Sequence, residues 1–300
     1  MSLKFQGFAF SALAWLTLVA SFWLPTWSTQ AQLVILSPII LLLGVPHGAL
    51  DTVFVRQLVV IQSAAGWMLF LIAYLLAAVS VAAVWWFAPG FFLVVFLLIS
   101  AFHFSGDPDS QTPVWFRALY GGAVIVCPIA LHADAVLEIF ALLSGLPAAQ
   151  AVVVALQSLA WPWVAAIAIA AIAGARRDLP RSIELVSMTA LLCFAPPLMG
   201  FTVYFCFMHS ARHVLRTRTY STVGTLRHLL GLAVWPMLFT LAGVALAAWL
   251  FEDKPLDMRL VQLLFVGLAA LTVPHMMVVE KVRLSGWVLG SRKSGSSSSS

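Results

Sequence analysis

The histidines are the residues of this sequence best suited to chemistry, because His47, His103, His209 and His275 lie in or at the end of long apolar runs. Ionisable side chains inside membrane segments are costly and usually functional. His209 and His213 form the sequence His-Ser-Ala-Arg-His, whose spacing places both imidazoles on one face of a helix. Such a pair suits two ligands of one metal ion, although alone it is weak support for a metal site.

Two histidines share a second pattern, in which an aspartate follows one helical turn later: His47 precedes Asp51, and His103 precedes Asp107. A metal-bound imidazole usually donates its other ring N–H to a carboxylate or carbonyl, which fixes the tautomer. The spacing predicts that Asp51 orients His47 and that Asp107 orients His103. The alternative is that both aspartates merely lie at helix ends in water.

His275 follows Pro274 near the end of the last apolar run, and Glu280 comes shortly after it. Three roles are open for His275: a further metal ligand, a group that hydrogen-bonds a ligand, or a buried histidine of the core. Glu280 is a candidate to support the same site. We expect no catalytic role for His132 and His228, which lie near predicted interfaces.

The ligand types limit the choice of metal. Four imidazoles without a thiolate set suit zinc, copper, iron or nickel, and on an octahedral ion they would leave two positions open. The three cysteines lie inside apolar segments and form no metal motif. Apolar side chains beside the histidines are candidates to line a pocket for a flat apolar ligand, although most aromatics of the chain pack or face lipid: Phe102, Phe104, Tyr204, Phe205 and Met208.

Membrane-spanning helices must position these side chains. Hydrophobic residues make up 62% of the sequence and charged residues 9%, whereas soluble proteins have about 45–50% and about 25%. Residues 5–50, 57–106 and 228–251 contain no Asp, Glu, Lys or Arg, and a transmembrane helix needs about 20 apolar residues. We predict an all-α, polytopic transmembrane helical bundle. A β-barrel is excluded, because its strands alternate apolar and polar residues in segments of about 10.

Turn signals divide residues 1–290, a single integral-membrane domain, into about eight to ten spans, of which we prefer ten. Residues 134–147 carry Asp134 and Glu138 and predict a short interfacial helix. A single kinked helix is the alternative to the two short passes that meet at Pro196 and Pro197. We expect residues 291–300, which are rich in Ser and Gly, to be a disordered tail or an expression remnant. The expected spans are 7–24, 32–52, 66–87, 91–105, 114–132, 151–174, 183–195, 198–214, 229–251 and 258–281.

Lysine and arginine cluster at alternate helix ends, which predicts a multi-pass protein of the inner (plasma) membrane with a cytoplasmic N-terminus. The lipid bilayer is therefore one expected partner. Topology also accounts for the net charge of +5, so we expect no binding of nucleic acid. In this arrangement His47, His103, His209, His213 and His275 all lie toward the cytoplasmic ends of their helices.

An ordered set of motifs resembles the Brp/Blh family of membrane β-carotene 15,15′-dioxygenases. The set comprises Gly-Val-Pro-His-Gly-Ala-Leu-Asp at 44–51, Phe-His-Phe-Ser-Gly-Asp at 102–107, His-Ser-Ala-Arg-His at 209–213 and Pro-His at 274–275. The resemblance extends from about residue 32 to residue 284, and the order of the motifs makes it specific.

The resemblance implies iron(II), dioxygen and cleavage of all-trans-β-carotene at the central double bond into two all-trans-retinals. It implies four catalytic iron ligands, which carry over to His47, His103, His209 and His213. It also implies a helical fold rather than the β-propeller of soluble carotenoid oxygenases, and a functional link to retinal-binding rhodopsins. Because β-carotene dissolves in lipid, we expect a tunnel that opens laterally into the bilayer.

The alternative class is a membrane protein that binds haem or a carotenoid without catalysis. A haem held between two histidines explains the pair His209 and His213 poorly, because both would point the same way. A retinal Schiff base, as in a rhodopsin itself, needs a lysine in the middle of a span. The four lysines of this chain all lie outside the middle of the expected spans: Lys4, Lys254, Lys281 and Lys293.

Overall fold

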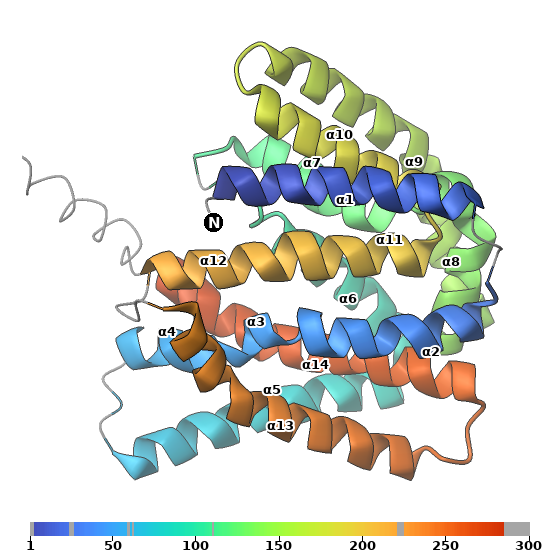
Figure 1. The fold of residues 1–300 in the computed structure, drawn as a ribbon. Coiled ribbons are helices and arrows are strands. Elements are labelled where there is room, and N and C mark those ends of the chain that lie inside the picture. The colour runs from blue at the N-terminus through green and yellow to red at the C-terminus, as the bar shows by residue number, and fades with distance from the viewer. Residues whose placement is uncertain are drawn as a thin grey trace, which may run out of the picture.

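The computed structural model describes residues 3–23, 27–58, 61, 63–109, 111–220 and 225–284. Within these ranges it describes only the backbone of 47, 56–58, 219–220, 226, 230 and 280–284. The elements are α1 (Leu3–Trp23), α2 (Thr29–Ile39), the π-helical turn η1 (Ile40–Gly44), α3 (Pro46–Ala49), α4 (Asp51–Leu58), α5 (Ala64–Phe87), α6 (Pro89–Phe104), α7 (Val114–Val126), α8 (Ile129–Ser144), α9 (Leu146–Ala175), α10 (Leu179–Phe194), α11 (Pro197–Val203), the π-helical turn η2 (Tyr204–Ser210), α12 (Ala211–Tyr220), α13 (Leu226–Leu250) and α14 (Leu256–Leu284). All regular secondary structure in the described ranges is helical, so the prediction of an all-α fold rather than a propeller is confirmed (Figure 1).

Five of the described helices are long and apolar enough to cross a membrane, namely α1, α5, α9, α13 and α14. The bent pair α7 and α8 adds a sixth if it counts as one span, while α2 with η1 and α6 are apolar but shorter. This bears out a polytopic membrane protein, with fewer qualifying helices than the preferred ten spans. Helix length accounts for the difference, because α6 and α10 have 16 residues each and α12 has 10, short of the about 20 that a full span needs.

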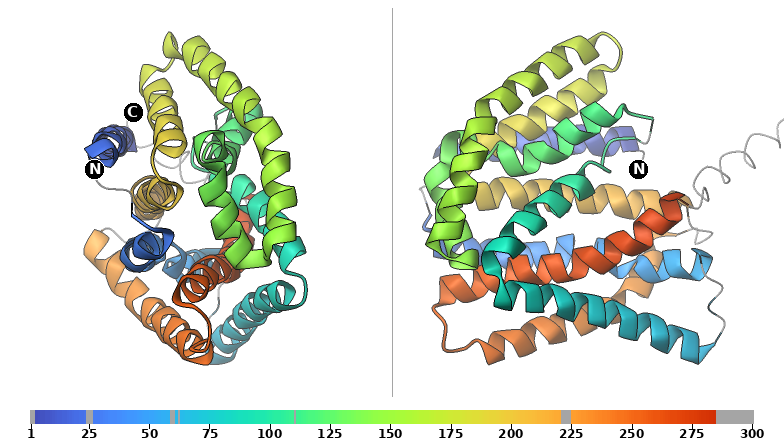
Figure 2. Two further views of the ribbon diagram at one scale, coloured as in Figure 1. Left: turned by 90° about the vertical axis from the view of Figure 1, so that its right-hand side faces the viewer. Right: turned by 180° about the vertical axis from the view of Figure 1, so that it is seen from behind.

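The long helices run roughly alongside one another, and the segments rich in basic residues meet at one end of the bundle. The N-terminal end of α1 and the C-terminal ends of α4, α12 and α14 lie together there (Figures 1 and 2). The opposite end carries the connection from α13 to α14. This arrangement agrees with the positive-inside pattern, and the assignment of the basic end to the cytoplasm stays a prediction.

Two predictions were wrong in this region: the interfacial helix expected over 134–147 and the span expected over 114–132. The structure has α7 and α8 there instead. Helix α7 ends at Val126, and after a 57° bend at Cys127 and Pro128 the chain continues as α8. A proline lacks the N–H that an unbroken helix needs, which favours the bend at this point. Asp134 and Glu138 are exposed on one side of α8 while Val136 and Ile139 are buried on the other. The acidic pair therefore marks the outer face of a packed helix.

Residues 195–197 form a turn between two helices and not a kink within one. Ala195 has an extended backbone, with φ of −77° and ψ of 153°. A Cβ added to Gly200 would lie 3.3 Å from the carbonyl oxygen of Leu191, so α11 packs closely against the end of α10. The two short elements expected on either side of Pro196 are thus separate helices.

Two π-helical turns lie where the inner helices touch. Gly44 ends η1, and a Cβ at this position would collide with the ring of Phe205 in η2. Ser210, at the end of η2, donates its hydroxyl to the carbonyls of Leu43 and Gly44, at 2.8 and 3.1 Å. π-Helical turns occur frequently at functional sites, and here they bring two histidine-bearing segments together.

Candidate metal centre and substrate cavity

Four described histidines from four segments of the chain gather inside the bundle. His103 ends α6, His209 lies in η2, and His213 and His275 lie in α12 and α14. The ring centroid of His103 is 4.6 Å from that of His209 and 5.4 Å from that of His275, and the centroids of His213 and His275 are 5.1 Å apart. The Nε2 atoms of all four rings are buried. Three residues of the expected ligand set therefore lie together, and His275 lies among them.

The fourth expected ligand, His47, lies in α3. This helix contacts η1, α12 and α14, so its backbone adjoins the segments that carry His213 and His275. The side chains of His47 and Glu280 are outside the described residues, and their expected roles stay predictions.

Two aspartates hold histidines of the cluster, in a pairing that differs from the one predicted. The Nδ1–H of His209 donates to Oδ1 of Asp107 at 2.9 Å, and the Nδ1–H of His275 donates to Oδ1 of Asp51 at 2.6 Å. All four side chains are buried. The spacing had assigned Asp107 to His103 and Asp51 to His47. In both cases a turn separates the aspartate from the helix that carries the preceding histidine. Each aspartate therefore reaches a histidine from a distant part of the sequence instead.

A tyrosine hydroxyl completes each pair. Tyr204 donates to Oδ2 of Asp107 at 2.5 Å, and Tyr74 of α5 donates to Oδ2 of Asp51 at 3.1 Å. Tyr74 was not among the residues predicted from the sequence. The signal that could have indicated it is a rare tyrosine inside an apolar span, because the chain has only 4 tyrosines and a buried phenol needs a hydrogen-bond partner.

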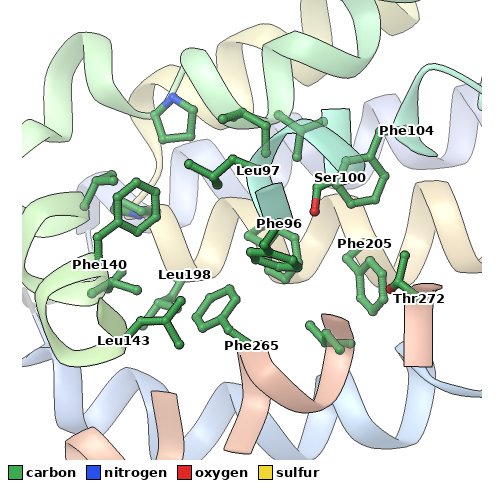
Figure 3. Close-up of a pocket in the computed structure, with 18 of the residues that line it drawn as sticks. Phe96, Leu97, Ser100, Phe104, Phe140, Leu143, Leu198, Phe205, Phe265 and Thr272 are labelled. Carbon is green, nitrogen blue, oxygen red and sulfur yellow. The ribbon is translucent and has the colours of Figure 1, made fainter. Parts of the chain in front are cut away.

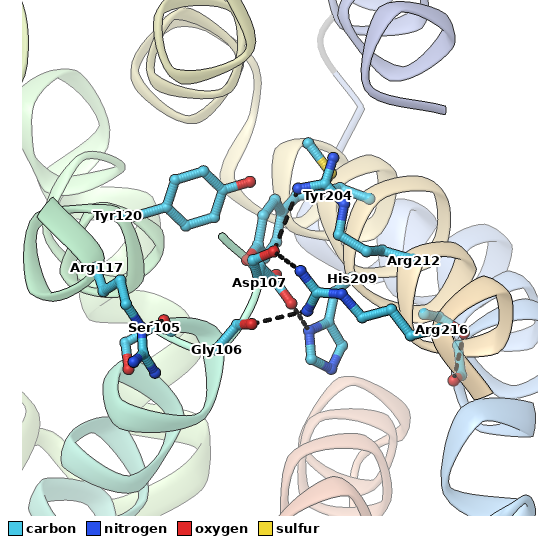
Figure 4. Close-up of polar contacts among 12 residues, drawn as sticks. Ser105, Gly106, Asp107, Arg117, Tyr120, Tyr204, His209, Arg212 and Arg216 are labelled. Atoms are coloured by element: carbon cyan, nitrogen blue, oxygen red, sulfur yellow. Dashed lines mark hydrogen bonds and ion pairs between the residues drawn. The ribbon is translucent and has the colours of Figure 1, made fainter. Parts of the chain in front are cut away.

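Arginines fix the loop that carries Asp107 (Figure 4). Arg216 donates to the carbonyls of Gly106 and Asp107, at 2.8 and 2.5 Å. Arg212 donates to the Asp107 carbonyl at 3.3 Å and pairs with Glu184 through two bonds of 2.8 and 2.6 Å. These guanidinium groups were interpreted only as topology signals. In the structure they donate hydrogen bonds to the backbone carbonyls of Gly106 and Asp107 and so fix this loop.

The electrostatic surroundings keep Asp107 ionised. Burial by itself raises the pKa of a carboxyl group, but His209, the Tyr204 hydroxyl and Arg212 outweigh that effect. The pKa of Asp107 therefore lies below its usual value. A carboxylate accepts from Nδ1 and leaves the lone pair of His209 on Nε2, which is the form that a metal binds.

An apolar cavity lies beside the histidines, with about 890 Å³ of empty space when its open side is included. Figure 3 shows its lining running from Phe104, Phe205 and Thr272 at one end to Phe140 and Leu198 at the other. Its polar side chains are Ser100, His103 and Thr272, and the rest are apolar: Phe96, Leu97, Phe104, Val124, Ile125, Pro128, Val136, Ile139, Phe140, Leu143, Pro197, Leu198, Phe201, Phe205, Phe265 and Leu268.

Of the five side chains expected to line a pocket, Phe104 and Phe205 line this cavity. Phe102 lies instead on the outer surface of α6, where 55% of it is exposed. Tyr204 is turned to Asp107, and Met208 is buried beside Gln6 of α1. Helical periodicity explains the division, because residues adjacent in a helix face different sides.

Comparisons with known proteins place these features in a family. The sequence model described as "Beta-carotene 15,15′-dioxygenase" matches residues 38–283. The chain belongs to the β-carotene 15,15′-dioxygenase family. It is 28% identical over 266 residues to the β-carotene 15,15′-dioxygenase of uncultured marine bacterium 66A03, covering 81% of this chain and 90% of the relative. No solved structure matches the chain.

The β-carotene 15,15′-dioxygenase match contains the whole histidine cluster, both aspartates and both tyrosines that hold them. It also contains every residue of the apolar cavity. Helix α1 lies before its start and contributes Gln6, which accepts from Arg212 at 2.9 Å. The family thus spans the site, while α1 supports it from outside the matched residues.

The cluster fits a metal ion by its chemistry. Within the described ranges, no three His, Cys, Asp or Glu side chains form a ready-made metal site. The donors are nevertheless neutral imidazoles with buried Nε2 atoms, and Asp107 and Asp51 hold two of them through Nδ1. This carboxylate–histidine arrangement is the usual support of a metal-bound imidazole, and imidazole is a suitable ligand for iron.

Proposed function

We propose that this chain cleaves β-carotene at the central 15,15′ double bond into two all-trans-retinal molecules, with iron(II) and dioxygen. The observation that carries the proposal is the position of His103, which belongs to the histidine cluster and also lines the apolar cavity. A polyene in that cavity would lie against the histidines. The family match supports β-carotene as the polyene.

His47, His103, His209 and His213 would hold the iron, as the resemblance to the Brp/Blh family implies. Iron(II), when bound, supplies the activation of dioxygen that the cleavage requires. The central carbon–carbon double bond and the oxygen–oxygen bond break, and one oxygen atom goes to each carbon as a carbonyl, so β-carotene and dioxygen balance the reaction without a further reductant. Asp107 keeps His209 in the tautomer and orientation that a ligand needs.

The cavity would position the substrate and exclude water. Leu97, Phe201 and Phe265 give it apolar walls, and a flat polyene gains dispersion contacts along such a surface. The cavity would hold the central double bond in a fixed position and orientation beside the histidines. Such positioning contributes a large part of the rate acceleration of an enzyme. A dry site also protects the reaction from side reactions with water.

A second apolar cavity of about 810 Å³ supports access from the bilayer. It lies among α5, α6 and α14 and shares Phe96 and Thr272 with the cavity beside the histidines. Helix α5 is exposed along most of its length, with apolar residues such as Leu76 and Val79 on its surface. Carotene dissolved in lipid would reach the site through this side of the bundle, and retinal would leave to the membrane, where a rhodopsin is the partner that the resemblance implies. The protein would lie in the plasma membrane with its basic end in the cytoplasm.

Expression in a cell that produces β-carotene tests the proposed function. We expect the pigment to fade and all-trans-retinal to accumulate, both measured by chromatography of extracted lipids. His228 gives a matched control, because it is an exposed histidine at the start of α13 and is not part of the histidine cluster. The variant His228→Ala should leave retinal formation unchanged. Unchanged β-carotene, with the protein present in the membrane, would instead favour a carotenoid-binding protein without catalysis.

A further inference from the structure

We infer that His275 is a direct ligand of the metal at this site, with Asp51 and Tyr74 as its support. The inference rests on the proposed function for the presence of a metal, and it adds a residue to the four ligands that the resemblance implies. Its basis is the arrangement of His275 in the structure, since the sequence left three roles open for this residue.

The spacing of the rings is the first observation. A metal–nitrogen bond of about 2.1 Å puts each ring centroid roughly 3.3 Å from the metal, so two neighbouring ligands have centroids roughly 4.6–5.5 Å apart. The centroid of His275 is 5.4 Å from that of His103 and 5.1 Å from that of His213. The corresponding distance between His103 and His209 is 4.6 Å. The separations of His275 from His103 and His213 therefore fall in the range expected of neighbouring ligands, as does the separation of His103 from His209.

The second observation is that His275 and His209 are held in the same way. In each case Nδ1 meets a buried aspartate whose other carboxylate oxygen accepts a tyrosine hydroxyl. One set is Tyr204, Asp107 and His209, and the other is Tyr74, Asp51 and His275. Both aspartates leave the lone pair of their histidine on the opposite nitrogen, Nε2, which is buried in the cluster.

The two sets come from different elements, so the likeness does not follow from one repeated segment of chain. Tyr204 and His209 share η2 and reach Asp107 in the loop after α6. Tyr74, Asp51 and His275 come from α5, α4 and α14. Side chains from three separate helices therefore orient the His275 imidazole toward the other histidines. A histidine that only fills space in the core would not need to be oriented toward them.

Metal binding without substrate tests the inference. Cobalt(II) serves as the probe, titrated anaerobically into the purified full chain in detergent, with calorimetry for affinity and visible absorption for the coordination. We expect His275→Ala to weaken cobalt binding at least about 10–100-fold and to change the visible bands, because a lost ligand alters both. Added free imidazole should restore much of the wild-type spectrum. His228→Ala should bind as the wild type does.

Two matched pairs keep the test decisive if His275→Ala does not fold. Asp51→Asn and Asp107→Asn should weaken cobalt binding to a similar extent, about 10–100-fold, and Tyr74→Phe should act in the same direction as Tyr204→Phe with a smaller loss. Wild-type affinity and spectrum in His275→Ala, or in Asp51→Asn when Asp107→Asn is impaired, would overturn the inference. Failure of the wild type to bind cobalt or iron would instead remove the metal from the proposed function.

Discussion

Replacing His103, His209 or His213 by alanine should lower retinal formation at least about 100-fold, because each change removes an imidazole that would bind the metal. The same holds for His47, which enters from the resemblance. The measurement is retinal per milligram of purified protein, together with iron content by elemental analysis. Both should fall together if these residues are ligands.

His228→Ala is the control, since it removes an exposed imidazole at the start of α13. Thermal melts in detergent separate loss of metal from loss of fold. A variant at His103, His209 or His213 that keeps both normal iron and normal activity would remove that residue from the proposed set.

Filling the cavity should lower the rate of cleavage without removing a metal ligand. Leu97 lines the cavity, whereas its neighbour Leu98 is 66% exposed on the outer face of α6. Leu97→Trp places an indole where the polyene would lie, and we expect β-carotene cleavage to fall at least about 10-fold while cobalt or iron binding stays normal. Leu98→Trp adds the same bulk on the lipid side and should leave both properties unchanged.

Measuring cleavage and metal binding for both tryptophan variants distinguishes an effect on substrate binding from an effect on the metal centre. Overpacking costs typically about 1–3 kcal/mol, so a melt in detergent shows whether Leu97→Trp remains folded. Equal activity of a folded Leu97→Trp variant and the wild type would mean that the substrate lies elsewhere. In that case the cavity of about 890 Å³ would have another use.

The sequence predicted the histidines better than it predicted their partners. His209 and His213 follow from helical spacing, and apolar runs without charges predict the helical bundle. The assignment of Asp107 to His103 was different, because local spacing shows only which groups are near each other along one helix. Asp107 follows the end of α6, and packing of η2 brings His209 to it.

Polar residues within apolar helices were harder to interpret. In the sequence, Arg212 and Arg216 indicate only which end of a helix faces the cytoplasm. The structure shows that both also donate hydrogen bonds to the loop that carries Asp107. Tyr74 is one aromatic among many in the apolar sequence of α5, and only the packing of α5 against α14 shows that its hydroxyl meets Asp51. Likewise, Asp134 and Glu138 give α8 the polarity of an interfacial helix, although Ile139 on its other face lines the cavity. In each case the deciding contact joins residues distant in the sequence.

Turnover of β-carotene by purified, iron(II)-loaded protein in liposomes, under isotopically labelled dioxygen, is the most direct test of the proposed cleavage. We expect two all-trans-retinals for each β-carotene consumed, with label in the aldehyde oxygen of both when the products are trapped quickly enough to prevent exchange with water. Label in only one of the two aldehydes, aldehydes from any other double bond, or no consumption of β-carotene by protein that has bound iron would contradict it.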